Sequence, residues 1–328
     1  MTLIAIEEHW ILPELTAALK ALPEHQRDES LAFNEMGDNL QRLEDLGAGR
    51  IETMDAQGID ISVLALTPPG TQPLPAADAV RLSRAANDAA AAAVGAHPSR
   101  FRALSTLPLS SPRDVAEELA RAAGIGHVGT MVYGRSGEVF LDDPGYDEFF
   151  AAAAELHQPV FIHPQLPSLA VRDASYRGFD PMTELALATF GWGWHLDAAT
   201  AALRLILRGT FDRHPDLQIV LGHWGEMLLF WLDRADSLSR IAGLERKVSD
   251  YVRSNFFITS SGMLNPALLR HALSVTSVDR LIFSTDYPFQ RPARAEIDSF
   301  LDEFGSARER EQFSSANAAG LFRLNLEH

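Results

Sequence analysis

Eight short apolar runs recur along the chain, separated by longer segments with helical periodicity. The runs are rich in Val, Ile, Leu and Phe, which is the composition of buried strands. They cover residues 3–9, 59–66, 101–109, 127–134, 159–165, 217–225, 255–262 and 280–289. Amphipathic segments typical of helices lie between them, for example at 76–98, 111–124 and 144–158. This alternation over residues 1–328 predicts an α/β fold, a single-domain (β/α)8 TIM barrel.

Two of the predicted connections are long, at residues 10–50 after the first strand and 166–200 after the fifth. In a barrel both would lie on the C-terminal face, where active sites are built. The second connection is rich in aromatic residues, namely Phe179, Phe190, Trp192 and Trp194. Such residues suit either core or subunit packing or the wall of a site, and we take Trp194 as a candidate substrate contact. A doubly wound open sheet is the alternative fold, but no GxGxxG or P-loop motif follows a predicted strand.

The first predicted strand ends in charged residues, because LIAIEEHW passes from apolar side chains to Glu7, Glu8 and His9. Alternation along a strand puts Glu7 and His9 on one face, together with Leu3 and Ala5, and Glu8 on the other. In a barrel we expect Glu7 and His9 to face the mouth and Glu8 to face the helices. Unpaired buried charge is expensive, so this stretch needs a compensating partner.

Three further strands end in a histidine or a carboxylate. His163 follows the apolar run PVFI, His223 lies in LGHWGE, and Asp286 lies in FSTDYPF. Imidazole and carboxylate groups without sulfur suit Zn²⁺, Mn²⁺ or Fe²⁺. Because the strand ends of a barrel share one rim, we expect these groups to meet and to form a divalent metal site. Other histidines are assigned to structure rather than to the site: His25, His97, His127, His157, His214, His271 and His328.

The segment HWGE places Glu226 three residues after His223, between glycines that suit a tight turn. A carboxylate behind a histidine fixes the tautomer of the ring and raises its basicity. We therefore interpret His223 and Glu226 as a functional pair. The alternative is that Glu226 only caps a helix predicted over MLLFWLDRADSLSRI, residues 227–241.

Composition excludes several classes of protein. The chain has no cysteine, which rules out disulfides, thiolate metal sites and cysteine nucleophiles. Lys20 and Lys247 lie outside the strand-like runs, so Schiff-base chemistry and a carbamylated bridging lysine are not expected. The net charge of −16, spread along the chain, argues against nucleic acid or an anionic membrane as partner. No apolar stretch reaches the length of a membrane span and no signal-like segment begins the chain, so we expect a soluble cytoplasmic protein.

These motifs together resemble the amidohydrolase superfamily. E-x-H on the first strand, the histidine of the fifth, GHxGE on the sixth and S-x-DYPF on the eighth are similar to its metal-dependent decarboxylase branch. That branch includes gamma-resorcylate, 5-carboxyvanillate and aminocarboxymuconate-semialdehyde decarboxylases. The resemblance also covers MDAQGID, ALRLILRGTFDRHPDLQIVLGHWGE and NAAGLFRL, and so runs over nearly the whole chain.

The resemblance implies one divalent metal ion, Zn²⁺ or Mn²⁺, with the ligands Glu7, His9, His163 and Asp286. It also implies that Asp286 donates a proton to the substrate carbon, with His223 and Glu226 as catalytic partners. The implied reaction is non-oxidative decarboxylation of a small aromatic acid of the ortho-hydroxybenzoate type, or of an unsaturated acid. The chain departs from the usual GHxGExLPF at residues 227–230, which lack the proline. This departure puts the local substrate wall in doubt.

A carboxylate substrate calls for a cation, and Arg50 and Arg234 occupy positions that look recurrent in the family. Either could equally be a surface or interface arginine. Two other functions remain open from the residues: a mononuclear metal-dependent hydrolase of a lactone, amide or ester, and a non-catalytic binding or scaffold barrel. The apolar residues of the predicted helix and the long loops suggest a homodimer or homotetramer.

Overall fold

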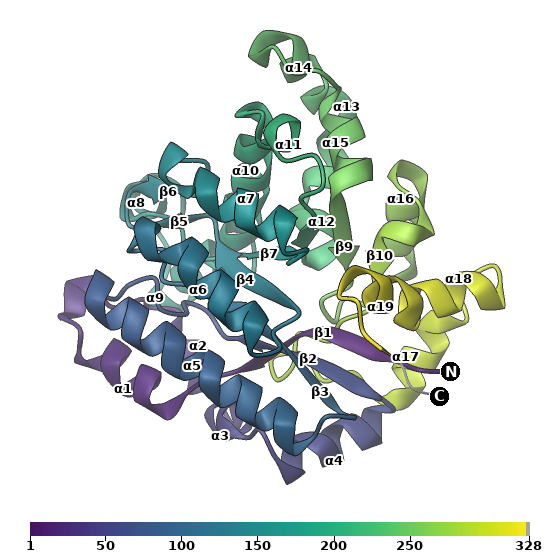
Figure 1. The fold of residues 1–328 in the computed structure, drawn as a ribbon, viewed down its shortest axis with the longest axis horizontal. Coiled ribbons are helices and arrows are strands. Elements are labelled where there is room, and N and C mark those ends of the chain that lie inside the picture. Colours follow the sequence, from purple (N-terminus) through teal and green to yellow (C-terminus); the bar gives the residue numbers. More distant parts are fainter. Residues whose placement is uncertain (326–328) are drawn as a thin grey trace.

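Eight parallel strands form a barrel in the computed structural model, which describes residues 1–325 (Figure 1). Their order is β1-β2-β3-β4-β7-β8-β9-β10, and every printed pairing between them is parallel. The strands are β1 (Ile4–Trp10), β2 (Ile61–Leu66), β3 (Phe101–Thr106), β4 (Gly129–Tyr133), β7 (Val160–His163), β8 (Ile219–Leu221), β9 (Phe256–Thr259) and β10 (Leu281–Ile282). Each lies within or beside a predicted run, which confirms the TIM-barrel prediction. A small antiparallel hairpin, β5 (Arg135–Ser136) with β6 (Val139–Phe140), follows β4.

The barrel closes between its first and last strands through backbone hydrogen bonds. The Ile6 amide donates to the Phe283 carbonyl (3.3 Å), and the His9 amide donates to the Tyr287 carbonyl (2.7 Å). The second bond joins the end of β1 to the segment after β10. The two chain segments that carry E-x-H and S-x-DYPF are therefore held side by side.

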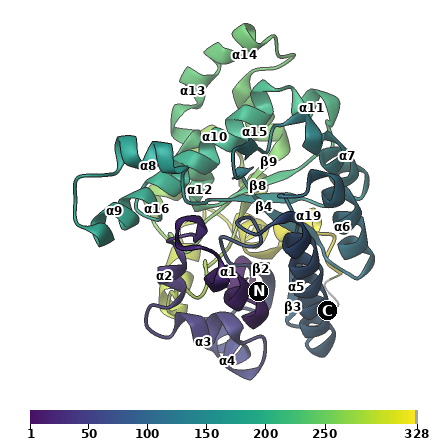
Figure 2. The ribbon, with the colours of Figure 1, turned by 90° about the vertical axis from the view of Figure 1, so that its left-hand side faces the viewer.

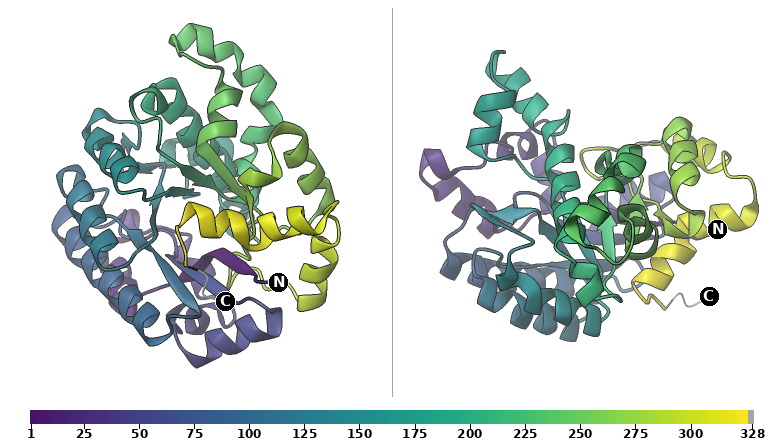
Figure 3. Two further views of the ribbon diagram at one scale, coloured as in Figure 1. Left: turned by 45° about the vertical axis from the view of Figure 1, so that its right-hand side comes forward. Right: turned by 90° about the horizontal axis from the view of Figure 1, so that it is seen from above.

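Helices surround the strands in sequence order, as the colour gradient shows (Figure 3). They are α1 (Pro13–Ala21), α2 (Leu31–Asn34), α3 (Asn39–Glu44), α4 (Ala48–Gln57), α5 (Ala76–Ala96), α6 (Pro112–Gly124), α7 (Asp147–Glu155), α8 (Leu169–Ser175), α9 (Pro181–Ala188), α10 (Gly193–Leu207), α11 (Thr210–Arg213), α12 (His223–Glu226), α13 (Leu232–Ala235), α14 (Ser237–Ala242), α15 (Val248–Asn255), α16 (Pro266–Val275), α17 (Arg294–Leu301), α18 (Ala307–Glu311) and α19 (Asn317–Leu321). In α5 the buried residues Ala79, Leu82, Ala86 and Ala90 recur every three or four positions, so one stripe packs on the barrel. No helix among residues 1–325 is long and apolar enough to cross a bilayer.

Two apolar layers hold the barrel together. The inner layer consists mainly of strand residues, including Ile4 and Ile6. It also contains Ala318 in α19 and Phe322 directly after it, and α19 lies beside β1 in Figure 1. The outer layer, between strands and helices, contains Leu3 and Ala5. The sequence analysis placed Leu3 and Ala5 on the same face as Glu7 and His9, and this was wrong. A bulge at Glu7 reverses the alternation, as described below.

The two long connections form much of the C-terminal face. Residues 10–50 contain α1 to α3 and the start of α4, and residues 166–200 contain α8, α9 and the start of α10. Helices α8 and α9 project to one side of the barrel (Figure 2). Both connections contribute residues to the main cavity at the mouth.

The helix predicted over 227–241 is broken in the structure. Met227 has a φ of 67°, a 3₁₀ turn runs over Leu228–Trp231, and the short helices α13 and α14 follow and project outward (Figure 1). A positive φ lies outside the right-handed helical region, so a residue that adopts it interrupts a helix. The backbone takes this conformation directly after Glu226, whose side chain turns inward. The local sequence is apolar enough for a helix, but the preceding turn prevents it.

Candidate metal centre and active site

Glu7 and His9 reach the barrel mouth from the end of β1 through a β-bulge. The pairing of β1 with β2 shifts its register between Ile6 and Glu8, and Glu7 has a φ of 79°. The extra residue lets Ile6 face the interior while Glu7 and His9 also face the site. Glu8 points the other way, as expected, and accepts hydrogen bonds from the Thr285 amide (3.0 Å) and hydroxyl (2.6 Å).

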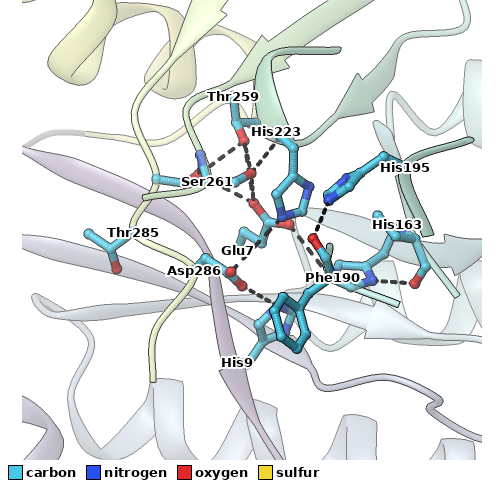
Figure 4. Close-up of polar contacts among 12 residues, drawn as sticks. Glu7, His9, His163, Phe190, His195, His223, Thr259, Ser261, Thr285 and Asp286 are labelled. Carbon is cyan, nitrogen blue, oxygen red and sulfur yellow. Dashed lines mark hydrogen bonds and ion pairs between the residues drawn. The ribbon is translucent and has the colours of Figure 1, made fainter. Parts of the chain in front are cut away.

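The structure brings together the four residues that were implied as metal ligands (Figure 4). The His9 Nε2 atom lies 3.2 Å from Asp286 Oδ1, and His163 Nε2 lies 3.6 Å from Glu7 Oε1. Single donor atoms of Glu7, His9 and His163 all lie within 4.8 Å of one another, as do those of Glu7, His223 and Asp286. These residues come from four different strand ends, so the closed barrel is what makes the cluster.

Unpartnered polar atoms in this cluster fit a divalent cation. Glu7 Oε1 and His9 Nε2 are buried and have no hydrogen-bond partner among the described residues. His163 Nδ1 lies 2.6 Å from the Pro164 carbonyl, which only accepts, so Nδ1 carries the hydrogen and the Nε2 lone pair is free. A buried polar atom without a partner is costly, and a metal ion would satisfy several of these atoms at once. Nitrogen and oxygen donors of this kind suit Zn²⁺ and Mn²⁺ alike.

Burial dominates the electrostatics of the cluster. It raises the pKa of Glu7 to about 8 and that of Asp286 to about 7. It lowers the pKa of His9 to about 3 and holds that of His163 well below its ordinary value. Desolvation therefore disfavours every charged form here. A bound cation would reverse this for the two carboxylates and would use the neutral imidazoles as ligands.

His223 and Glu226 form the pair that their spacing suggested. Glu226 is fully buried, and its Oε1 atom lies 2.7 Å from His223 Nδ1. Burial lowers the pKa of His223, but the charge of Glu226 and its hydrogen bond, with Glu7 and Asp286, outweigh this and raise it to about 10. Burial likewise raises the pKa of Glu226, but His223 and His195 together bring it to about 2. Glu226 is thus an ionised carboxylate inside the barrel mouth, not an exposed helix cap.

His195 belongs to this group and was missed in the sequence. Its Nδ1 atom lies 2.6 Å from the other oxygen of Glu226, and its ring lies 4.7 Å from that of His223. It comes from the start of α10, at the end of the long aromatic connection. The neighbouring Trp194 was noted, but a histidine in a loop of variable geometry has no periodicity that would point it toward the site.

The backbone at the strand ends is unusual. Seven of the nine non-glycine residues with positive φ among those described lie around the mouth, and they are Glu7, His223, Trp224, Glu226, Met227, Ser261 and Asp286. Such conformations cost roughly 1–3 kcal/mol each and concentrate at functional sites. Position 222 requires glycine because other side chains lie very close to its backbone. A Cβ there would meet Ser261 Oγ at 2.9 Å and Glu7 Oε1 at 3.1 Å.

A cavity of about 590 Å³ opens above the cluster. Its walls include His9, His163, His195, His223 and Asp286 and are otherwise largely apolar, with the aromatic residues Phe33, Phe190, Trp192, Trp194 and Phe289. This volume is typical of a site for a small organic molecule. A second, more open cleft of about 710 Å³ lies over α17. It contains none of the clustered histidines or carboxylates, so the cavity of about 590 Å³ is the candidate site.

The two arginines considered for substrate binding lie outside the lining of this cavity. Arg50 is 1% exposed and sits behind β1, where its guanidinium donates to the His9 carbonyl at 2.5 Å and to the Asp45 carbonyl at 2.8 Å. Arg234 is exposed on α13. Trp194 does line the cavity, with its ring 6.3 Å from that of His163.

The fold and site define a metal-dependent barrel of the amidohydrolase type, and comparison with known proteins agrees. The family model described as Amidohydrolase matches residues 32–324. The chain belongs to this family.

Relatives named as decarboxylases are similar to the chain over almost its whole length. The chain is 33% identical to a gamma-resorcylate decarboxylase of Rhizobium sp., with 98% of each chain covered. It is also 33% identical to the decarboxylase orsB of Emericella nidulans, covering 95% of this chain and 99% of that one. Among solved structures, a 5-carboxyvanillate decarboxylase of Novosphingobium aromaticivorans has a TM-score of 0.87 at 32% identity, with 98% and 97% covered. That structure contains manganese and 3-methoxy-4-hydroxy-5-nitrobenzoic acid.

Proposed function

We propose that this protein is a carboxy-lyase that removes CO₂ from a small aromatic acid with a hydroxyl group next to the carboxylate. The observation that carries the proposal is the cluster of Glu7, His9, His163 and Asp286 at the base of a largely apolar cavity. The chain's relatives named above are decarboxylases, two of them of hydroxybenzoates. The cavity of about 590 Å³ has room for a single substituted ring.

Glu7, His9, His163 and Asp286 would hold one divalent metal ion, Mn²⁺ or Zn²⁺. When bound, the ion supplies a positive charge and a template for the adjacent phenolate and carboxylate oxygens of the substrate. The unpartnered atoms of Glu7 and His9 support this assignment. Manganese in the carboxyvanillate decarboxylase favours Mn²⁺ for a first test.

Asp286 would donate the proton that replaces the carboxyl group. In the metal-free protein burial raises the pKa of Asp286 to about 7, the direction that a general acid requires, whereas a bound cation would lower it. The proton is added to the ring carbon that bears the carboxylate. The bond to CO₂ then breaks, its electron pair restores the aromatic ring, and CO₂ leaves.

His223 and Glu226 would place a positive charge beside the reacting carboxylate. His223 Nε2 lies 4.0 Å from Asp286 Oδ2, and Nδ1 is held by Glu226. No lysine or arginine is among the cavity-lining residues within 1–325. The protonated His223 is therefore the group on this chain best placed to balance substrate charge. Trp194, with Phe190 and Trp192, would wall the ring.

The test uses purified protein loaded separately with Mn²⁺ and with Zn²⁺. Gamma-resorcylate, 5-carboxyvanillate, orsellinate and a set of small lactones would be offered, with CO₂, the phenolic product and released acid measured independently. We expect equimolar CO₂ and phenol from at least one hydroxybenzoate and no turnover after metal removal. Acid release from a lactone, without CO₂ from any carboxylate, would overturn the proposal in favour of a hydrolase.

We also propose that the protein assembles as a homodimer or homotetramer. Phe230, Trp231 and Ile241 are 68%, 60% and 78% exposed on and next to the broken segment that follows β8. Exposed apolar side chains gathered in this way commonly mark an interface. Light scattering after size-exclusion chromatography tests it, and a monomer at micromolar concentration would refute it.

A further inference from the structure

His195 lies between a carboxylate and a backbone carbonyl at the rim of the cavity. Its Nδ1 atom is 2.6 Å from Glu226 Oε2. Figure 4 shows its other contact, in which Nε2 is 2.9 Å from the carbonyl oxygen of Phe190. Its side chain is 17% exposed, whereas that of Glu226 is fully buried. The ring is thus placed where the aromatic connection meets the turn after β8.

Both partners of His195 only accept hydrogen bonds. A backbone carbonyl has no hydrogen to give, and an ionised carboxylate has none either. Glu226 is ionised, because its pKa is about 2. Only a ring that carries a hydrogen on both nitrogens, an imidazolium, can donate to both of these acceptors. A neutral tautomer would leave one of these two short contacts without a hydrogen.

Glu226 is consequently shared between two imidazole rings, one on each oxygen. His223 Nδ1 approaches Oε1 at 2.7 Å, and His195 Nδ1 approaches Oε2 at 2.6 Å. Without His195, Oε2 would be a buried charged atom lacking its partner, which is costly. The carboxylate would then be drawn toward other donors or water and would no longer hold the His223 ring in one orientation.

We propose that His195 is a positioning residue that fixes Glu226, and through it His223, while fastening the aromatic connection to the cavity rim. Phe190 and Trp192, which line the cavity, lie within five residues before His195 in the chain. The His195 imidazolium would therefore hold in place both the Glu226 carboxylate and the aromatic wall at Phe190 and Trp192. This inference rests on the proposed decarboxylase function, and its structural part can be tested without activity.

The activity test compares His195→Ala, His195→Gln and His195→Phe. In the alanine and phenylalanine variants we expect metal content close to that of the unaltered protein, a lower melting temperature because Glu226 Oε2 loses its partner, and kcat lowered about 10–100-fold. The glutamine variant keeps one amide donor for Glu226 and should be less impaired. Added imidazole should restore part of kcat in the alanine variant, which leaves space beside the open cavity. It should not help the phenylalanine variant, whose ring occupies that space.

A matched control is His214→Ala. His214 is similarly covered, with a side chain 13% exposed, and its Nε2 atom lies 3.1 Å from Asp147 Oδ1, a residue outside the cavity lining. It should leave kcat and KM unchanged. Unaltered protein with the same imidazole concentration controls for competition at the metal.

The activity-independent test is a ¹⁵N spectrum of histidine-labelled protein, with the His195 signals identified by their loss in His195→Gln. Two protonated nitrogens at neutral pH are expected. One unprotonated nitrogen would overturn the proposal, as would normal kcat and KM in His195→Ala or a lack of rescue by imidazole. If the unaltered protein decarboxylates no acid, the proposed function fails, and the spectrum still decides whether His195 holds Glu226 as an imidazolium.

Discussion

Replacing Asp286 by asparagine tests the proposed proton donor with almost no change in shape. The amide cannot deliver a proton, but it keeps an oxygen that can stand at Oδ1, 3.2 Å from His9 Nε2. Glu7, His9 and His163 are untouched, so metal should still bind, although more weakly because one negative charge is lost. The variant therefore separates proton transfer from metal binding.

The expected loss follows from what a general acid contributes. Such a group is typically worth about 10²–10⁴-fold, or roughly 3–5 kcal/mol of activation free energy. The Asp286 side chain is only 15% exposed, so it is largely shielded from bulk water. Because little water can replace it as the acid, we expect a loss toward the upper end of this range.

The assay follows CO₂ release and, separately, exchange of deuterium from D₂O into the product ring. With CO₂ present, exchange runs through the reverse reaction, in which CO₂ adds to the ring carbon and Asp286 then removes its proton. Both rates should therefore fall by about the same factor, with metal content measured in each sample. Asp142→Asn is a matched control, since Asp142 is also buried but pairs with Arg204 at 2.6 Å and Arg208 at 2.9 Å outside the cavity lining. Near-normal activity of metal-loaded Asp286→Asn would refute the assigned role.

Three further predictions concern the metal and the first strand. Double replacement of Glu7 and His9 by alanine should abolish metal binding in calorimetric titration, and retained stoichiometric metal would contradict the ligand assignment. The pKa of Glu7 is raised from 4.5 to about 8 by burial, so its contribution to the stability of metal-free protein is fully present below pH 4.5 and is lost as pH rises toward 8. Metal affinity should rise over the same interval because binding displaces the proton, and urea unfolding with and without metal measures both effects. Arg50→Met should destabilise the protein by about 3–5 kcal/mol in urea unfolding. The variant removes a buried cation from the His9 carbonyl and leaves the charge of Glu8 less balanced. A change confined to KM, with unchanged stability, would instead assign Arg50 to the substrate site.

The sequence could predict those residues of the candidate site that lie at strand ends, because the strand ends of a barrel meet at one rim. Glu7, His163, His223 and Asp286 each follow an apolar run, and a closed barrel brings such ends together whatever the loops do. The residue types then indicate a divalent metal. The prediction rested on where each apolar run ends, a local pattern that holds even where the bulge at Glu7 breaks the alternation.

Residues in connections could not be placed in this way. His195 reaches Glu226 only because the aromatic connection folds over the turn after β8, and Arg50 turns behind β1 rather than into the mouth. The break at Met227 likewise comes from the inward turn of Glu226, against the helical preference of the apolar residues that follow it. Each outcome depends on contacts between segments distant in sequence.

The segment LIAIEEHW, residues 3–10, shows what the sequence predicts and what only the tertiary structure decides. The spacing of Glu7 and His9 on one strand is a property of the sequence, and it identified two groups of the candidate metal site. The bulge at Glu7 appears only in the tertiary structure, where it lets Ile6 and Glu7 face the interior in succession, which regular alternation along a strand does not allow. The sequence by itself determined which chemical groups end the strands. The packing of strands and connections decided their distances, their protonation and the partners that hold them, because buried charge is stabilised only by groups that folding brings within reach.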